Sequence, residues 1–314
     1  MLRFAVLKNR RHEIYLLLGS LCFAISSIPA KLAMEAGLSA WRLTQIRTTG
    51  AFLILFLYVY AKSKNSLRVN RKEIPILLVF GVFGFAAVNL LYFLAIQRLN
   101  VGIALIIEFT APIWIALWLR FVQKRIVSKL MWWGLVTGLS GLALIAQVWR
   151  GLTLDGLGVV YALSCAFALT IYFLVGEKMV GVKSSEATMA LGLGVSSAFF
   201  AIIQPWWTFP FDQLQEVVQL TGRLSEVSVP TYLLVLWVIV IGTAIPYFLV
   251  LTGLRGLSAA KTSAIGMSEP VFGGIFAWIF LYEKLNFTQS VGAIVVLVGI
   301  YLANRARLSV KDAT

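Results

Sequence analysis

Ser268-Glu269-Pro270 and Glu108-Phe109-Thr110-Ala111-Pro112 are the two stretches of this sequence that decide its fold. Each places a carboxylate and a proline inside a run of about twenty apolar residues, the length of a helix that crosses a bilayer. A charge at the centre of such a helix costs about 2.5 kcal/mol or more, and proline removes a backbone hydrogen-bond donor. Lipid tolerates a broken helix only where it faces protein or a water-filled cavity. The two stretches therefore predict helix breaks at Pro112 and Pro270 that line an internal path.

The composition around these stretches is that of an integral membrane protein. Of the 314 residues, 60% are hydrophobic and 13% are charged, with a mean hydropathy of +0.89. A soluble domain of this size needs more polar residues to cover its surface. The net charge of +14 comes from short basic clusters between apolar runs, a pattern that indicates membrane orientation and contact with lipid headgroups, and argues against nucleic acid.

Working outward from the two stretches, we predict an all-α protein with ten transmembrane helices. The apolar runs cover residues 14–34, 39–61, 74–96, 101–122, 130–148, 156–178, 186–209, 229–251, 259–281 and 287–303. Placing the amino terminus inside leaves few basic residues in the outer connections: Arg98, Arg150, Arg223 and Lys284. By the positive-inside rule both termini are cytoplasmic, with an inner segment at 1–13 and a tail at 304–314. The connection over 210–228 is expected to be either a short amphipathic helix or a solvated loop.

The sequence also repeats itself. A shift of 158 positions places several small or apolar residues on identical ones: Gly84 on Gly242, Leu91 on Leu249, Leu99 on Leu257, Pro112 on Pro270, Gly134 on Gly292, Leu139 on Leu297 and Gly141 on Gly299. Earlier in each half the shift is 144, which places Ser20 on Ser164, Phe23 on Phe167, Ala24 on Ala168 and Gly37 on Gly181. We predict a first five-helix repeat at 14–148 and a second at 156–303. Because five is odd, the second runs in the opposite sense, an architecture typical of secondary carriers.

With these motifs the chain resembles the ten-helix exporter family, EamA, of the drug/metabolite transporter superfamily. The resemblance covers nearly the whole chain and rests on the doubled five-helix unit, the Pro112 and Pro270 helices, and Glu283-Lys284-Leu285 followed by Gln289-Ser290-Val291-Gly292-Ala293. Stretches such as 89–97, 102–104, 108–112, 243–247 and 267–270 are similar to the threonine/homoserine exporter branch. One departure is Lys124-Arg125, which stands where the family usually has a Gly-Glu pair. Only the second half keeps that acid, as Glu283.

The resemblance implies export of amino acids or related small metabolites, driven by the proton gradient across a bacterial inner membrane. Alternatives are a carrier of drugs or amphipathic compounds, a carrier of nucleotide-sugar-like cargo, and a membrane scaffold that transports nothing. Arg47 and Lys261 are the cations that could favour phosphates. No hydrolase, metalloprotease or phosphate-loop motif occurs, so we expect no enzyme and no cofactor. His12, Cys22 and Cys165 lack partners at ligand spacing, and no metal site is expected. The oligomeric state is left open.

Helix depth separates the two buried acids. Glu108 lies ~10 Å and Arg47 ~12 Å below the outer ends of their helices, so an Arg47–Glu108 ion pair competes with a substrate role for Glu108. Glu269 lies ~15 Å deep, with no cation obviously level with it. There it could bind a substrate ammonium group or exchange a proton in antiport, because an apolar environment favours a neutral carboxyl group. The alternative is a carboxyl group that only stabilises the break at Pro270.

Other polar residues on the repeat-related helices are candidates for substrate binding or for helix packing. They are Asn89, Tyr92, Thr110, Tyr172, Thr243, Tyr247 and Ser268, of which Asn89 and Tyr247 are equivalent under the 158 shift. Gly134, Gly138 and Gly141 form one small face, and Gly292 and Gly299 form another. These faces predict close helix contact, either within a protomer or between protomers.

Overall fold

The structure, a computed structural model, describes residues 2–99, 101–149, 155–281, 286–306 and 308–309. Within them lie ten segments long and apolar enough to cross a membrane: Arg11–Glu35, Ala40–Leu67, Arg71–Ile96, Gly102–Phe121, Lys129–Ala146, Gly156–Val180, Ser185–Ile203, Thr231–Leu254, Ala259–Phe280 and Phe287–Arg305. They match the ten predicted runs. The second extends to Leu67, beyond its predicted end. The seventh is shorter than predicted and ends at Ile203, because Gln204 and Pro205 follow and proline disfavours a helical conformation for the residue before it.

Six of the described α-helices begin where the sequence supplies a capping side chain. Serine caps α2 (Ala40–Ser63), α7 (Lys129–Ala146), α9 (Ser185–Ile203) and α12 (Ala259–Gly266), aspartate caps α8 (Gly156–Val180) and asparagine caps α14 (Phe287–Arg305). Each cap accepts a hydrogen bond from a free N–H of the first turn. The first helix, α1 (Leu2–Glu35), continues through Pro29.

The fourth and ninth spans are interrupted at the two opening stretches. The fourth consists of α5 (Val101–Glu108) and α6 (Ala111–Phe121), and the ninth consists of α12 and α13 (Glu269–Leu281). Pro112 and Pro270 each lie in the first turn of the second piece, where a missing N–H leaves no hydrogen bond unmade. Each carboxylate therefore lies at the end of a helical piece, beside the break.

The third and eighth spans contain π-helical turns that the sequence analysis did not predict. The third is α3 (Ile74–Val79), η3 (Phe80–Ala87) and α4 (Val88–Ile96). The eighth is α10 (Thr231–Ile239), η7 (Val240–Ala244) and α11 (Ile245–Leu254). With a shift of 158, η7 falls on positions 82–86, inside η3. Such turns occur frequently at functional sites.

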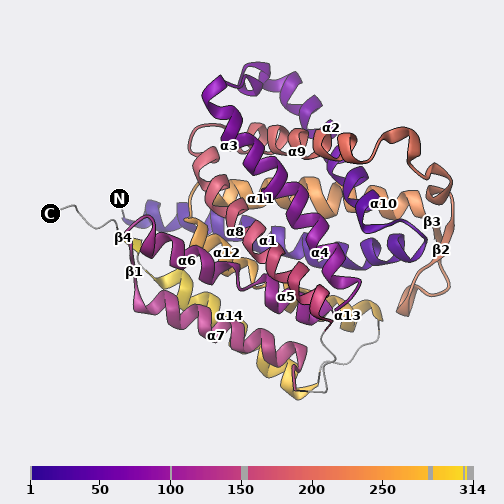
Figure 1. Ribbon diagram of the computed structural model, residues 1–314. Helices are drawn as coiled ribbons and strands as arrows, with labels where there is room; N and C mark the ends of the chain where they lie inside the picture. Colours follow the sequence, from indigo (N-terminus) through magenta and orange to yellow (C-terminus); the bar gives the residue numbers. More distant parts are fainter. Residues whose placement is uncertain (1, 100, 150–154, 282–285, 307, 310–314) are drawn as a thin grey trace.

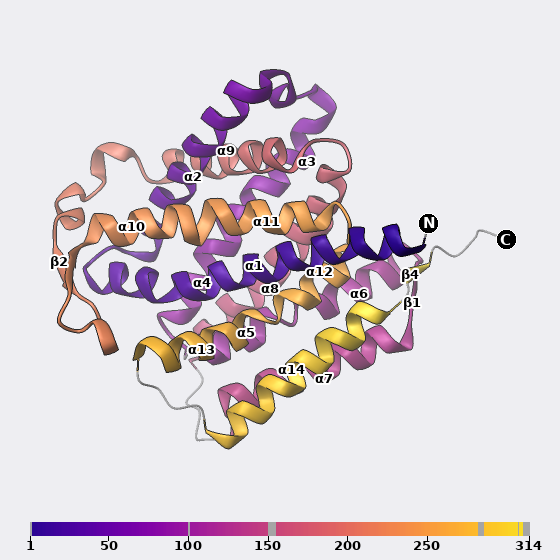
Figure 2. The ribbon, with the colours of Figure 1, turned by 180° about the vertical axis from the view of Figure 1, so that it is seen from behind.

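The helices form a bundle with both chain termini at one end (Figure 1). In the view from behind, α1 runs between the eighth span and the ninth, while α7 and α14 lie side by side at the edge of the bundle (Figure 2). A Cβ at Gly134 or Gly141 would meet the backbone of α14, and one at Gly292 or Gly299 would meet the backbone of α7. The two small faces therefore pack on each other within one protomer.

The long connection after α9 lies at the end of the bundle opposite to the termini (Figure 2). The predicted amphipathic helix is absent, and the segment is largely exposed, as the alternative of a solvated loop had it, although it carries local structure. The segment makes short turns, η4 (Trp206–Thr208), η5 (Phe211–Leu214) and η6 (Gly222–Leu224), and an antiparallel hairpin of β2 (Val217–Gln219) and β3 (Ser228–Pro230), with Val218 opposite Val229. Gly222, at a φ of 65°, allows the chain to turn back. At the termini end, β1 (Ile126–Val127) pairs with β4 (Leu308–Ser309).

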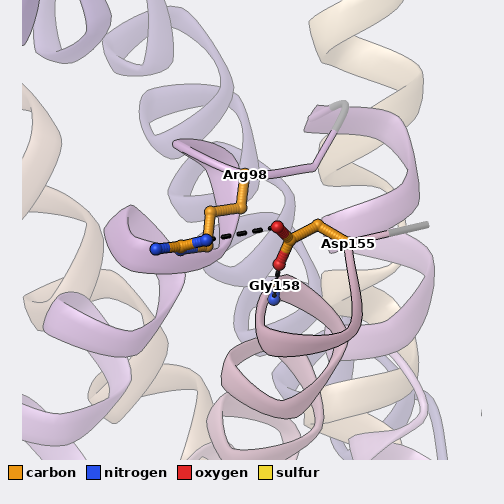
Figure 3. A network of polar contacts seen from close by, with 3 residues as sticks. All are labelled: Arg98, Asp155 and Gly158. Carbon is orange, nitrogen blue, oxygen red and sulfur yellow. Dashed lines mark hydrogen bonds and ion pairs between the residues drawn. The ribbon is translucent and has the colours of Figure 1, made fainter. Parts of the chain in front are cut away.

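A salt bridge also joins the two halves of the chain, near the connection between them. Arg98, after α4, donates a hydrogen bond from Nη1 to Asp155 Oδ2 at 3.2 Å, and Asp155 Oδ1 accepts the Gly158 N–H at 2.7 Å (Figure 3). Asp155 thus caps α8 and pairs with a residue of the first half.

Candidate functional site

A cavity of about 110 Å³ lies inside the bundle, between α1, α2, the third and eighth spans, α8, and the two interrupted spans. Seven of the residues singled out in the sequence line it: Arg47, Asn89, Tyr92, Glu108, Tyr172, Tyr247 and Glu269. Thr110, Thr243 and Ser268 do not. The residues that line the cavity are thus far apart in sequence, and the fold brings them to one place.

The two acids face the cavity from the two helix breaks. Glu108 is the last residue of α5 and Glu269 the first residue of α13. Glu269 interacts electrostatically with both Glu108 and Arg47, and the Glu108 carboxylate interacts with the Cys165 thiol. Two carboxyl groups and one guanidinium therefore line one cavity, a concentration of ionisable groups that is rare inside a membrane and marks substrate or proton pathways.

Arg47 does not pair with Glu108, although the similar depth of the two residues suggested an ion pair. Its Nε donates to Thr243 Oγ1 at 2.9 Å and its Nη2 to the Gly242 carbonyl at 2.7 Å, and its guanidinium lies 5.2 Å from the centre of the Phe93 ring. Arg47 and Glu108, both described by the structure, form no ion pair. The ion pair, one of the two roles considered for Glu108, is therefore absent, because depth gives the level of a side chain but not its direction around the helix. Glu269, for which depth indicated no neighbouring cation, interacts electrostatically with Arg47.

The cavity wall between Arg47 and the acids is aromatic and partly hydrogen-bonded. Tyr247 donates its hydroxyl to Asn89 Oδ1 at 3.2 Å, which joins the two residues that the 158 shift makes equivalent. The Tyr247 ring makes edge contacts with Phe23, Phe85 and Tyr172, with ring centroids 5.0, 4.9 and 5.5 Å away. These contacts fix the orientation of the Tyr247 and Tyr172 rings.

Three buried hydroxyls on the cavity wall have no hydrogen-bond partner among the described residues. They belong to Ser26, Tyr172 and Thr262. A buried polar group without a partner costs about 1–3 kcal/mol, so such groups are few in native structures. The three hydroxyls are therefore unsatisfied polar groups on residues beside the cavity.

The remaining predicted residues have local roles. Thr110 donates to the Ile107 carbonyl of α5 at 2.7 Å and accepts from Trp114 Nε1 of α6 at 3.2 Å, across the break in the fourth span. Thr243 donates to the Val238 carbonyl at 2.7 Å while it accepts from Arg47, so it positions Arg47. Ser268 is buried next to Glu269, and its hydroxyl has no partner in the described part of the chain.

Residues of the site that sequence reasoning missed include Ser26, Phe23, Thr262 and Cys165. Cys165 was considered as a metal ligand and set aside, yet its thiol lies beside Glu108. The run Ser20, Ser26 and Ser27 in the first span was a usable signal, since three hydroxyls in an apolar helix need partners. Ser20, Ser26 and Ser27 all line the cavity.

Comparison with known proteins identifies this architecture. The model of the EamA-like transporter family matches residues 10–147 and again residues 156–305. The chain belongs to the EamA-like transporter family. EamA proteins are members of the drug/metabolite transporter superfamily, so the chain is a multi-pass membrane transporter of a family that is not enzymatic.

Individual EamA relatives resemble the chain over most of its length. It is 23% identical to an uncharacterized inner membrane transporter, YicL, of Salmonella typhimurium LT2, over 94% of this chain and 95% of the relative. It is 27% identical to the threonine/homoserine exporter RhtA of Salmonella typhimurium SL1344, over 90% and 88%. A crystal structure of a protein with 15% identity superposes with a TM-score of 0.71, over 93% of this chain and 96% of that one, which shows a shared fold.

The structure also explains part of the departure from the family pattern at Lys124-Arg125. Lys124 has a φ of 52°, in the left-handed region where glycine is free of strain. The usual glycine of the family would fit this turn, and lysine adopts it at a small cost. The corresponding Glu283-Lys284 lies outside the described residues.

Proposed function

We propose that this protein is a secondary active transporter that exports amino acids or related small metabolites by alternating access, coupled to protons. The observation that carries the proposal is the convergence of Arg47, Glu108 and Glu269 on one small cavity. A zwitterion has a cationic and an anionic end, and this cavity offers a charged partner for each. RhtA, a relative over most of the chain, is a threonine/homoserine exporter.

The size of the cavity favours small cargo. Pockets for drug-sized ligands have volumes of about 300 Å³ or more, and a water molecule occupies about 30 Å³. At about 110 Å³, this cavity accommodates a molecule the size of a few waters. Nucleotide-sugar-like cargo is further disfavoured because two carboxylates face the same space. Lys261 lies elsewhere, with its Nζ donating to the Asn304 carbonyl at 2.7 Å.

The aromatic wall favours a second candidate, the export of amphipathic compounds. Phe23, Tyr92, Phe93, Phe109 and Phe173 line the cavity and would accept an apolar group. A non-transporting scaffold, in contrast, has no use for charged groups that are costly to bury.

Two features support alternating access. The family model matches the chain twice, and each matched half holds five of the ten spans. With an odd number of spans, the halves have opposite orientations in the membrane, as in other secondary carriers. Together with the basic connections on one side, this arrangement supports the proposal that both termini face the cytoplasm and that the protein lies in the inner membrane.

The interrupted spans suggest which side of the cavity is closed. At the termini end, α6 packs against α12. At the other end, the described parts of α5 and α13 make few close contacts with each other. We therefore assign the structure to a state in which the cavity is closed toward the cytoplasm. Separation of α6 from α12, together with closure of α5 on α13, would open the cavity to that side. Glu269, at the start of α13, lies where such a rearrangement pivots.

Reconstitution into proteoliposomes tests the proposal. The panel consists of threonine, homoserine, aliphatic and aromatic amino acids and one amphipathic dye, each measured with and without an imposed pH gradient. We expect flux of at least one amino acid, accelerated by the gradient. Flux of the dye alone would support the second candidate, and the absence of amino-acid flux would defeat the first.

A further inference from the structure

Arg47 has hydrogen-bonding capacity that the protein itself does not use. Its side chain is 6% exposed, so it is shielded from bulk solvent, and it lines the cavity. Nε and Nη2 bind Thr243 and Gly242, whereas Nη1 makes no hydrogen bond within the described part of the chain. A guanidinium has five N–H donors in one plane. Donors therefore remain for a molecule that enters the cavity.

The charge of Arg47 is also incompletely compensated. The Gly242 carbonyl, the Thr243 hydroxyl and the Phe93 ring stabilise the cation, but none of them carries a negative charge. Glu269 interacts with Arg47 electrostatically without an ion pair. Intramembrane charges pair with one another or mark the path of a substrate, and an anionic group on the cargo would complete this arrangement.

The geometry of the guanidinium selects among anions. Its planar fork matches the two oxygens of a carboxylate, which can accept two parallel hydrogen bonds. A phosphate ester would bring up to two negative charges toward a space already shared with Glu108 and Glu269. One carboxylate per molecule balances the site better, because a substrate ammonium can then face the acids.

We propose that Arg47 selects cargo by its carboxylate, and that an ammonium group of the same molecule faces Glu269. This inference rests on the proposed transport of amino acids and goes beyond it, since it names the residue that distinguishes an amino acid from an amine. Thr243 and the π-helical turn η7 act as positioning groups, because they hold the guanidinium on the cavity wall.

Lysine is not expected to replace Arg47. An ammonium has no planar fork, so it cannot keep the bonds to Gly242 and Thr243 in place while it binds both oxygens of a carboxylate. The Arg47→Lys variant keeps the charge and loses the geometry. Arg47→Gln loses both. The two variants together separate recognition by charge from recognition by shape.

The test uses the full-length protein in proteoliposomes and the amino acid that gives the highest flux in the panel described above. Unlabelled competitors are that amino acid, its methyl ester and its amide, each present with radiolabelled amino acid. For wild type we expect the ester and the amide to compete about tenfold to a hundredfold less well, the range for loss of a charged hydrogen bond. In Arg47→Gln, uptake of the amino acid falls at least tenfold, and the amino acid loses its advantage over the ester. For Arg47→Lys we expect uptake and competition to lie between those of wild type and those of Arg47→Gln.

Arg120→Gln is the matched control, because Arg120 is exposed at the end of α6 and lies outside the cavity. Melting temperature and monodispersity in detergent establish folding for every variant. If Arg47→Gln does not fold, the competitor series on wild type decides alone. Equal competition by ester and amino acid, or undiminished uptake by a folded Arg47→Gln, overturns the inference even where amino-acid flux is present. Absence of any amino-acid flux defeats the proposed function instead, and the inference with it.

Discussion

Glu269 occupies a position where one side chain can serve both cargo and protons, beside a helix break and on the cavity wall. We expect Glu269→Gln to reduce transport driven by a pH gradient at least tenfold, because glutamine keeps the size and shape of the side chain but cannot ionise. The measurement is flux with and without the gradient, with folded protein quantified in the membrane. Glu35→Gln, on an exposed residue that pairs with Lys31 at 3.8 Å, is the control. Full gradient-driven efflux by Glu269→Gln would remove Glu269 from the mechanism.

The Tyr172 hydroxyl provides a second test at the scale of one atom. It is buried on the cavity wall and has no partner among the described residues. Removing it in Tyr172→Phe should leave the melting temperature unchanged or higher, because an unsatisfied buried group costs about 1–3 kcal/mol. If cargo uses the hydroxyl, half-saturation of transport should shift to a severalfold higher concentration. Tyr60→Phe, an exposed tyrosine of α2, controls for the substitution. A lower melting temperature with normal transport would contradict the assignment.

At this scale the sequence predicted which residues matter better than how they pair. The ionisable side chains of Arg47, Glu108 and Glu269 are costly to bury in a membrane span, and this cost can be read directly from the sequence. Their partners depend on rotation about each helix axis and on neighbouring helices. For that reason the Arg47 contacts with Gly242 and Thr243, like the thiol beside Glu108, could not be derived from spacing.

At the scale of elements, the packing of α7 on α14 depends on glycine. A Cβ added at Gly299 would fall on the Gly138 backbone, which cannot move aside as a flexible side chain can. We expect Gly299→Ala to destabilise the protein by about 1–3 kcal/mol, the usual effect of overpacking, and to lower its melting temperature by several degrees. Gly156→Ala is the control, because a Cβ there meets nothing within 4 Å. Equal melting temperatures for the two variants would show that the helices can separate without loss.

The start of α8 provides a prediction on pH. The Gly158 N–H, assisted by Arg98, lowers the pKa of the Asp155 carboxyl below its ordinary value. Stabilisation by the carboxylate is therefore complete above about pH 4, where the carboxyl of the unfolded chain is ionised, and is lost as the pH falls through the lower pKa of the folded protein. We expect Asp155→Ala to lower the melting temperature at pH 7 more than Asp155→Asn, since asparagine still caps the helix. The difference between wild type and Asp155→Ala should shrink in acid. A constant difference would contradict the ionic contribution.

Element boundaries followed the sequence wherever a chemical signal was local. The serine caps and the two prolines are such signals, and the spans begin and break beside them. The π-helical turns had no comparable signal, because Gly81, Gly84, Gly242 and Thr243 are compatible with an ordinary α-helix. The hairpin after α9 was missed because its apolar residues also fit helical spacing, while the pairing of 217–219 with 228–230 is a long-range property.

The proposed orientation of the whole molecule can be measured on intact cells. A cysteine at position 225, in the exposed turn of the outer hairpin, should react with a membrane-impermeant maleimide. A cysteine at position 65, in the exposed connection after α2, should react only after permeabilisation. The wild-type protein, with Cys22 and Cys165 within its spans, gives the background. The reverse pattern would place both termini outside and invert the proposed direction of transport.

The π-helical turns η3 and η7 determine how the helical segments after them are rotated about the helix axis. An α-helix advances about 100° per residue, so one residue removed from such a turn would swing the rest of the helix by that angle. Asn89 lies just beyond η3, and Tyr247 lies just beyond η7. Shortening either turn would move one partner of their hydrogen bond off the cavity wall, although no side chain of the site had been replaced. In these two helices the number of residues is as much a part of the site as their identity.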